Sequence, residues 1–209
     1  SADWEVRWIR LGASLFCDSG VFSTSGSLEP MISPDGSLYQ FMEWLDGTNN
    51  ELHIHSYELM SEDIIEKLVQ LSQADVNVTV IVEEDPVEES EDLLKVRGMA
   101  YEMHTAGINF FWMGTPRGDD APPAPYQYIH SKVAVRDGDS VWIGSGNVKT
   151  STFPPSNWSS NRDWGLIINS EDVAQLFLTR MSWDENESHK HLIPYAPDEA
   201  ATGKPIGWT

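Results

Sequence analysis

The sequence is poor in cysteine, in basic residues and in long apolar runs. It has one cysteine, Cys17, among 209 residues, which excludes an internal disulfide and any zinc site built from several cysteines. No apolar run reaches the roughly 18 residues that a membrane-spanning helix needs, so we expect no transmembrane segment. Only 13 lysines and arginines stand against 33 acidic residues. A broad basic face for non-specific binding of nucleic acid is therefore not expected.

What the chain does contain is typical of one folded, acidic domain. Its length, with 40% hydrophobic and 11% aromatic residues, is sufficient for a substantial core. The formal net charge of −20 repels phosphate backbones at long range. It does not exclude a substrate that contains phosphate, because a small cationic pocket can lie within an acidic surface.

Short apolar segments of strand character alternate with segments of helical periodicity. We expect strands over 51–57, 76–82, 108–113, 129–135, 140–143 and 164–168. Helical periodicity covers 38–45, 61–71, 93–99 and 171–183, whereas 18–28 is expected to be a loop. Strands separated by helices predict an α/β fold with a mixed, mostly parallel β-sheet, flanked by helices on both faces.

One short region concentrates chemically active side chains. His130 and Lys132 are two residues apart, Asp137 follows after four residues, and Gly144-Ser145-Gly146-Asn147 follows after six more. In a strand, residues two apart face the same side, so His130 and Lys132 are predicted to project together. An imidazole can act as nucleophile or proton donor, and a neighbouring ammonium supplies positive charge to phosphoryl oxygens. The Gly-Ser turn adds a hydroxyl, an amide and backbone N–H groups suited to oxyanions.

This spacing resembles the signature of the phospholipase D superfamily, H-x-K-x4-D followed six residues later by G-S-x-N. The flanking order also resembles the family, with Ser33-Pro34 before a helix, Tyr57 at a strand end and Asn161-Arg162-Asp163 after the hairpin. The resemblance spans residues 30–183. It implies a metal-independent phosphodiesterase without a cofactor, in which a histidine attacks phosphorus and forms a covalent phosphohistidine.

The resemblance also implies roles for individual residues. His130 is the expected catalytic histidine, and Asp163 is the candidate to orient a histidine through its ring N–H. Lys132, which we count as catalytic, is expected to bind the substrate phosphate together with Ser145 and Asn147. Asp137 and Gly144 are expected to support the motif structurally, and no metal ligand is expected.

Members of the family bring two such motifs together, whereas this chain has one. The other histidines, His53, His55, His104, His189 and His191, lack a lysine two positions on. We therefore expect the second half to come from a homodimer partner or from a longer chain. The sequence begins at Ser1 without an initiator Met, as in a trimmed or mature form, and does not indicate a compartment. We expect residues 1–193 to form the domain and 194–209 to be a linker or tail.

Substrate and function class leave alternatives open. The expected substrate is a phosphodiester, and the acidic charge slightly favours a phospholipid headgroup ester over nucleic acid. The alternatives are an endonuclease of the same superfamily and a non-catalytic module that binds phosphate or a protein partner. His53 and His55 share a strand face and could bind metal, but a packed or exposed face is the simpler interpretation. The acidic run 83–92 lacks the glycine spacing of a calcium loop and is predicted to be a solvated face.

Overall fold

The computed structural model describes residues 24–84, 90–114, 126, 128–155, 160–186 and 192–194. Residues 85–89 of the acidic run lie outside these residues, as do Cys17, His189, His191 and the predicted tail from residue 195 onward. Within the described part, the strands are β1 (Ser27–Ile32), β2 (Glu51–Ser56), β3 (Asn77–Glu83), β4 (Asn109–Met113), β5 (Lys132–Arg136), β6 (Ser140–Gly144), β7 (Trp164–Asn169) and β8 (Leu192–Pro194). The helices are α1 (Ser37–Asp46), α2 (Glu62–Gln73), α3 (Ser90–Thr105) and α4 (Glu171–Asp184).

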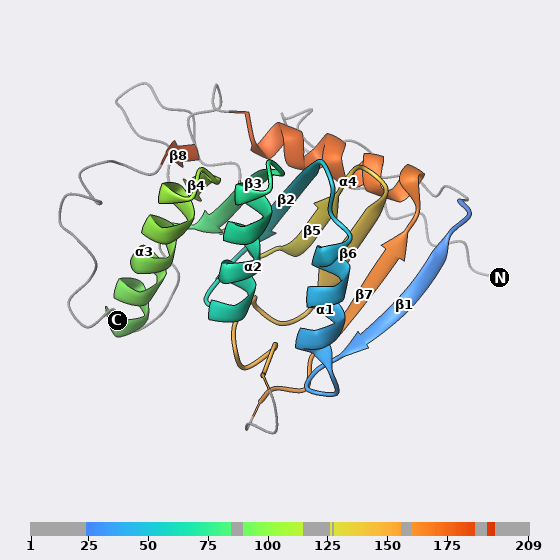
Figure 1. Cartoon of the computed structure of the whole chain (residues 1–209), viewed down its shortest axis with the longest axis horizontal. Helices are drawn as coiled ribbons and strands as arrows, with labels where there is room; N and C mark the ends of the chain where they lie inside the picture. Colours follow the sequence, from blue (N-terminus) through green and yellow to red (C-terminus); the bar gives the residue numbers. More distant parts are fainter. Residues whose placement is uncertain are drawn as a thin grey trace, which may run out of the picture.

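The eight strands form one sheet in the order β1-β7-β6-β5-β2-β3-β4-β8 (Figure 1). The predicted α/β class is confirmed, but the expectation of a mostly parallel sheet is wrong. Only β2–β3 and β3–β4 pair in parallel among the described strands, and the other five pairings are antiparallel. The physical reason is that no described helix separates β5, β6 and β7, and strands joined without a helical crossover pair antiparallel.

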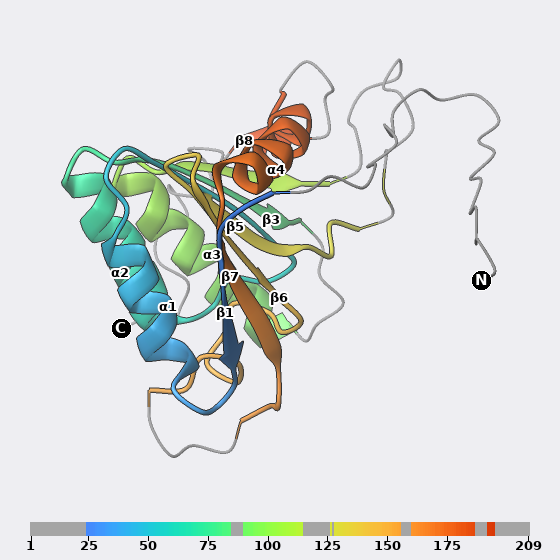
Figure 2. The ribbon, with the colours of Figure 1, turned by 90° about the vertical axis from the view of Figure 1, so that its right-hand side faces the viewer.

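Helices cover both faces of the sheet, as predicted. Figure 2 shows α1, α2 and α3 together on one side of the sheet and α4 on the other. The first side holds the larger apolar core, in which Phe41, Leu68 and Trp142 are almost fully buried. On the second side, Ala174 and Met181 of α4 pack against valines of β5 and β6. Among the described residues, no helix has the length and apolar character needed to cross a membrane.

Two strands were not predicted. β1 includes Ser27 and Leu28, which the sequence assigned to a loop, and most of its side chains are exposed. It is an edge strand that pairs only with β7 in the described sheet, so its residues need not alternate between apolar and polar. β8 is three residues long and pairs with β4 at the opposite edge. Pro194, where the tail was expected to start, is the last residue of this strand.

The arrangement gathers several strand ends at one edge of the sheet. In the pairing of β2 with β5, Ser56 lies opposite Lys132, so the end of β2 meets the beginning of β5. Gly144, which ends β6, lies opposite Gly165 near the beginning of β7. The Gly-Ser turn and the residues around His130 therefore lie at the same end of the sheet.

Candidate active site

His130 and Lys132 are in direct contact at the beginning of β5. His130 precedes the strand and is exposed, whereas the Lys132 side chain is 7% exposed. The ammonium nitrogen Nζ of Lys132 lies 3.1 Å from Nδ1 and 3.2 Å from Nε2 of His130, and it donates to the backbone oxygen of His130 at 2.9 Å. An ammonium can only donate, so a ring nitrogen that pairs with it carries a lone pair. Nucleophilic attack requires such a lone pair, so the ammonium has to release that nitrogen before the ring can attack.

Tyr57 packs against this pair from the end of β2. Its ring centroid is 4.9 Å from that of His130, and the Lys132 ammonium lies 5.5 Å from the Tyr57 ring. Tyr128 meets Tyr57 edge-on at 6.5 Å and is 43% exposed. These aromatic contacts fix the histidine ring on one side and exclude water from part of the lysine side chain.

Burial and nearby charge act on Lys132 in opposite directions. Burial, the larger effect, lowers the pKa of the Lys132 ammonium because it disfavours the charged form. The negative charges of Glu58 and Asp163 oppose this and raise the pKa. Lys132 therefore has a pKa below the ordinary lysine value of 10.5, with carboxylates close enough to favour its charge.

Ser145 and Asp163 are joined on the other side of the site. The Ser145 hydroxyl donates to Asp163 Oδ1 at 3.0 Å and accepts from the backbone N–H of Trp164 at 3.0 Å. Thr152 donates to the second oxygen, Asp163 Oδ2, at 3.0 Å. Gly146 lies so close to this pair that a Cβ there would come within 2.4 Å of Asp163 Oδ2 and of Thr152 Oγ1. A side chain at position 146 would therefore displace Asp163 or Thr152 from this arrangement.

The donor groups of Ser145 in the Gly-Ser turn, which the sequence predicted to be available to a phosphate, already make hydrogen bonds within the protein. The backbone N–H of Ser145 donates to the Trp164 oxygen at 2.8 Å, so this N–H is already committed to the sheet. The single hydroxyl proton of Ser145 goes to Asp163. A contact from Ser145 to a phosphate therefore requires its hydroxyl to rotate away from Asp163. In the described residues, Asp163 makes no hydrogen bond to His130 of the same chain.

Asn147 is held by a buried carboxylate that the sequence analysis did not single out. Its Nδ2 donates to Glu58 Oε2 at 2.6 Å, and Lys149 Nζ lies 2.6 Å from the same oxygen. Glu58 is 1% exposed. No spacing rule connects Glu58 with a motif almost ninety residues away, so only the fold reveals this contact.

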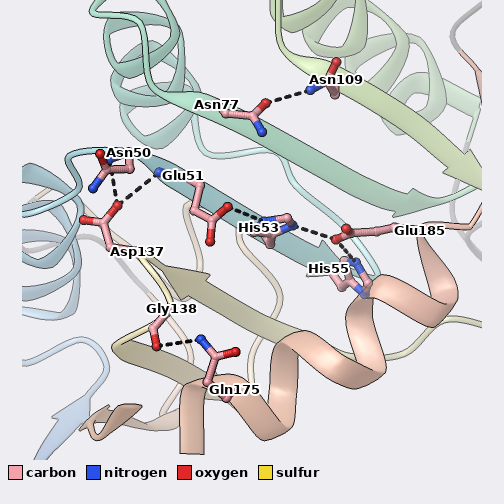
Figure 3. Close-up of polar contacts among 10 residues, drawn as sticks. All are labelled: Asn50, Glu51, His53, His55, Asn77, Asn109, Asp137, Gly138, Gln175 and Glu185. Carbon is pink, nitrogen blue, oxygen red and sulfur yellow. Dashed lines mark hydrogen bonds and ion pairs between the residues drawn. The ribbon is translucent and has the colours of Figure 1, made fainter. Parts of the chain in front are cut away.

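Asp137 lies at the opposite end of β5 from Lys132 and is remote from the candidate site. Its carboxylate accepts the backbone N–H groups of Asn49, Asn50 and Glu51 at 2.7 to 3.0 Å, two of which Figure 3 shows. Burial would raise its pKa, but these hydrogen bonds outweigh burial and lower the pKa below 3.8. Asp137 thus joins the turn after β5 to the segment that enters β2. Gly144 ends β6 against the ring of Trp142, where a Cβ would approach to 2.6 Å.

His53 and His55 form a separate cluster with Glu185 on the face of the sheet that α4 covers (Figure 3). Glu185 Oε1 lies 2.9 Å from His53 Nδ1 and 3.2 Å from His55 Nε2. Burial, the largest effect, lowers the pKa of His53, but Glu185 and Glu51 together outweigh it, so the pKa is raised. Within the described residues, no group of three or more His, Cys, Asp or Glu has an arrangement that could hold a metal ion.

Comparisons with known proteins agree with the geometry. The family model described as "Cardiolipin synthase, PLD-like domain" matches residues 41–184, more than half of the chain. No curated protein matches the chain in sequence. Nuc from Salmonella typhimurium, a phospholipase D family member, has 18% identity and a TM-score of 0.65, over 82% of this chain and 99% of Nuc. NucT from Helicobacter pylori has 12% identity and a TM-score of 0.63, over 82% of this chain and 100% of NucT.

A longer relative covers the same fold. Phosphatidylserine synthase from Haemophilus influenzae Rd KW20 has 17% identity and a TM-score of 0.57, over 85% of this chain and 42% of the synthase. At these identities the solved structures show a shared fold, and the family model shows the family. The chain belongs to the phospholipase D superfamily of phosphodiesterases, through a PLD-like domain that contains His130 and Lys132.

Proposed function

We propose that this protein is a phosphodiesterase that acts through a covalent intermediate on His130. The observation that carries the proposal is the contact between the exposed His130 ring and the buried Lys132 ammonium. This pair presents a nucleophile beside a fixed positive charge, which is the combination that attack on a phosphodiester needs. Because Lys132 supplies the charge, we propose that the reaction is independent of metal and of any cofactor.

The proposed reaction has two steps. A ring nitrogen of His130 forms a bond to phosphorus, and the bond from phosphorus to the leaving oxygen breaks while a second histidine gives that oxygen a proton. Water then attacks phosphorus, the bond to His130 breaks, and the second histidine takes the proton from the water. Lys132 and Asn147 bind the phosphoryl oxygens in both steps, and Ser145 joins them after its hydroxyl rotates.

We propose that the second histidine comes from another copy of the motif, in a homodimer or in a longer chain. The sequence has one His-x-Lys pair, so a single chain supplies one of the two histidines. Asp163 makes no hydrogen bond to His130 within the described chain, so we propose that it orients the histidine of the other half. On this proposal the domain forms one half, and because β8 includes Pro194, the domain extends beyond the predicted boundary at residue 193.

For the substrate we favour a phospholipid headgroup ester. The net charge of −20 works against a long polyanion more than against a single phosphodiester. Exposed aromatic side chains at the site, Trp164 and Tyr128, suit the apolar part of a lipid. The similarity to a phosphatidylserine synthase is consistent with this, while that to Nuc and NucT keeps an endonuclease as the alternative.

The experiment is hydrolysis of a panel of diesters by a dimeric sample or by the full-length protein, with His130→Ala as the control. Phosphatidylcholine vesicles represent the lipid, and a short DNA duplex and single strand represent nucleic acid. We expect lipid hydrolysis that falls by about 10³-fold or more in His130→Ala. Cleavage of DNA alone would identify the endonuclease. Binding of phosphate without turnover of any diester would identify a non-catalytic module and contradict the proposal.

A further inference from the structure

Glu58 is a buried carboxylate beside the candidate active site. It follows β2 and Tyr57, and it is 1% exposed although it carries a charge. Burial of a carboxylate costs several kcal/mol in typical proteins unless cations and hydrogen-bond donors compensate for it. The compensating groups include Asn147 and Lys149, which both contact its Oε2 at 2.6 Å.

The backbone fixes Glu58 in this position. Its carbonyl oxygen accepts from the Val148 N–H at 3.1 Å and from the Ser56 hydroxyl at 2.6 Å. The neighbouring Leu59 forms a parallel bridge with Val148, and Met60 donates to the Val148 oxygen at 2.7 Å. The segment after β2 is thus joined to the segment after the Gly-Ser turn. The carboxylate has little freedom to move away from Asn147.

The contact determines the orientation of the Asn147 amide. A carboxylate only accepts hydrogen bonds, so the NH₂ group of Asn147 must face Glu58. One N–H is committed to Glu58, and the same nitrogen carries a second N–H. The other amide atom, Oδ1, is buried and has no hydrogen-bond partner within the described part of the chain. Because of Glu58, the group of Asn147 that can donate to a bound phosphate is the second N–H of Nδ2.

We propose that Glu58 is a positioning residue of the active site, which orients the Asn147 amide and holds Lys149 through its Oε2. This inference rests on the proposed function for its catalytic consequence. The negative charge of Glu58 also raises the pKa of Lys132 against the effect of burial, which provides a second readout. Glu58 itself does not need to touch the substrate.

The direct test follows the Asn147 side-chain NH₂ signals by ¹H–¹⁵N NMR, assigned with Asn147→Ala. It also measures the Lys132 pKa by titration of the side-chain ¹³Cε signal, assigned with Lys132→Met. Glu58→Gln keeps the shape and removes the charge, so we expect a lower Lys132 pKa. Lys149→Met removes the competing cation, so we expect a higher Lys132 pKa. Glu58→Asp keeps the charge and serves as the conservative rescue. Glu185→Gln is the matched control, because it removes a partly buried carboxylate that does not act on Lys132.

Displaced Asn147 NH₂ signals and a lower Lys132 pKa in Glu58→Gln, both restored in Glu58→Asp, support the proposal. Asn147 NH₂ signals that are unchanged in both Glu58→Gln and Lys149→Met overturn it, and Lys149→Met still provides a test if Glu58→Gln does not fold. With the diester that the wild type hydrolyses, the alkaline limb of the pH profile should move to lower pH in Glu58→Gln, by one unit for a tenfold change in the lysine equilibrium. An unmoved limb also overturns the proposal. Absence of hydrolysis by the wild type contradicts the proposed function instead and leaves the NMR result valid.

Discussion

Lys132 Nζ lies within 3.2 Å of both ring nitrogens of His130 and also donates to the backbone oxygen of that histidine. One ammonium thus contacts the ring and the main chain of the residue proposed as nucleophile. The lysine side chain is buried and the histidine is exposed. The ammonium is therefore shielded from water, whereas the histidine beside it is accessible to a substrate.

Phosphate affinity should depend on the protonation of Lys132. Its pKa is lowered from 10.5, chiefly by burial, so the ammonium loses its proton at lower pH than an exposed lysine does. Binding of inorganic phosphate should weaken as an alkaline pH rises towards 10.5, a range in which phosphate keeps its charge. Isothermal calorimetry across this range tests the expectation. Lys132→Met should bind phosphate weakly at every pH, and wild-type affinity that is unchanged up to pH 10.5 would contradict the assignment.

Asp137 should stabilise the fold without taking part in the chemistry. Its pKa lies below 3.8 in the folded protein, so its stabilising effect is complete above 3.8 and is lost as pH falls through the folded pKa. Asp137→Asn should lower the free energy of unfolding by about 2 kcal/mol at neutral pH, because hydrogen bonds to a charged acceptor are lost. Urea unfolding at pH 7 and near pH 3 measures this difference. Equal destabilisation at both pH values would contradict it.

The pair of His53 and Glu185 should make stability depend on pH in two directions. The pKa of Glu185 is lowered from 4.5 to about 2, so its contribution is present above 4.5 and is lost as pH falls towards 2. The pKa of His53 is raised above 6.5, so its contribution is complete below 6.5 and is lost as pH rises through the raised value. The pair therefore stabilises the fold most between 4.5 and 6.5.

Glu185→Gln is the variant that tests this window. We expect it to lower the free energy of unfolding by about 1 to 2 kcal/mol near pH 5.5, and by less near pH 9. Two further carboxylates lie near the histidines: Glu51 on β2 is 3.7 Å from His53, and Asp184 on α4 is 3.8 Å from His55. Tyr126 donates to Asp184 at 2.7 Å, and its pKa is raised by burial and by that carboxylate. A destabilisation that is independent of pH would contradict the assignment to this pair.

The local parts of the fold could be predicted from the sequence because they depend on neighbouring residues. The hairpin of β5 and β6 needs a tight turn, and Asp137 and Gly138 adopt the positive φ angles of 49° and 67° that Asp and Gly tolerate. The apolar periodicity of residues 61–71 likewise predicts both the helix α2 and the face of it that is buried. Pairing direction could not be read in the same way, because it depends on where the chain turns after each strand.

In the candidate site, too, contacts between neighbours in the sequence could be predicted, and contacts between distant residues could not. His130 and Lys132 are two residues apart, so their proximity follows from local geometry. The contact between Asn147 and Glu58, by contrast, joins positions 89 residues apart. Likewise, Ser145 was expected to be available to a phosphate, whereas the approach of β7 brings Asp163 to its hydroxyl. Such contacts depend on the order of strands in the sheet, which no spacing in the sequence specifies.

The most direct test of the account is detection of the covalent intermediate on His130. A dimeric or full-length sample is mixed with a labelled diester that it hydrolyses, quenched rapidly in base and analysed by peptide mass spectrometry. We expect a phosphoryl adduct on the peptide that contains His130 in the wild type, and no such adduct in His130→Ala. Hydrolysis that proceeds in His130→Ala, or turnover with a trapped adduct on a residue other than histidine, would contradict it.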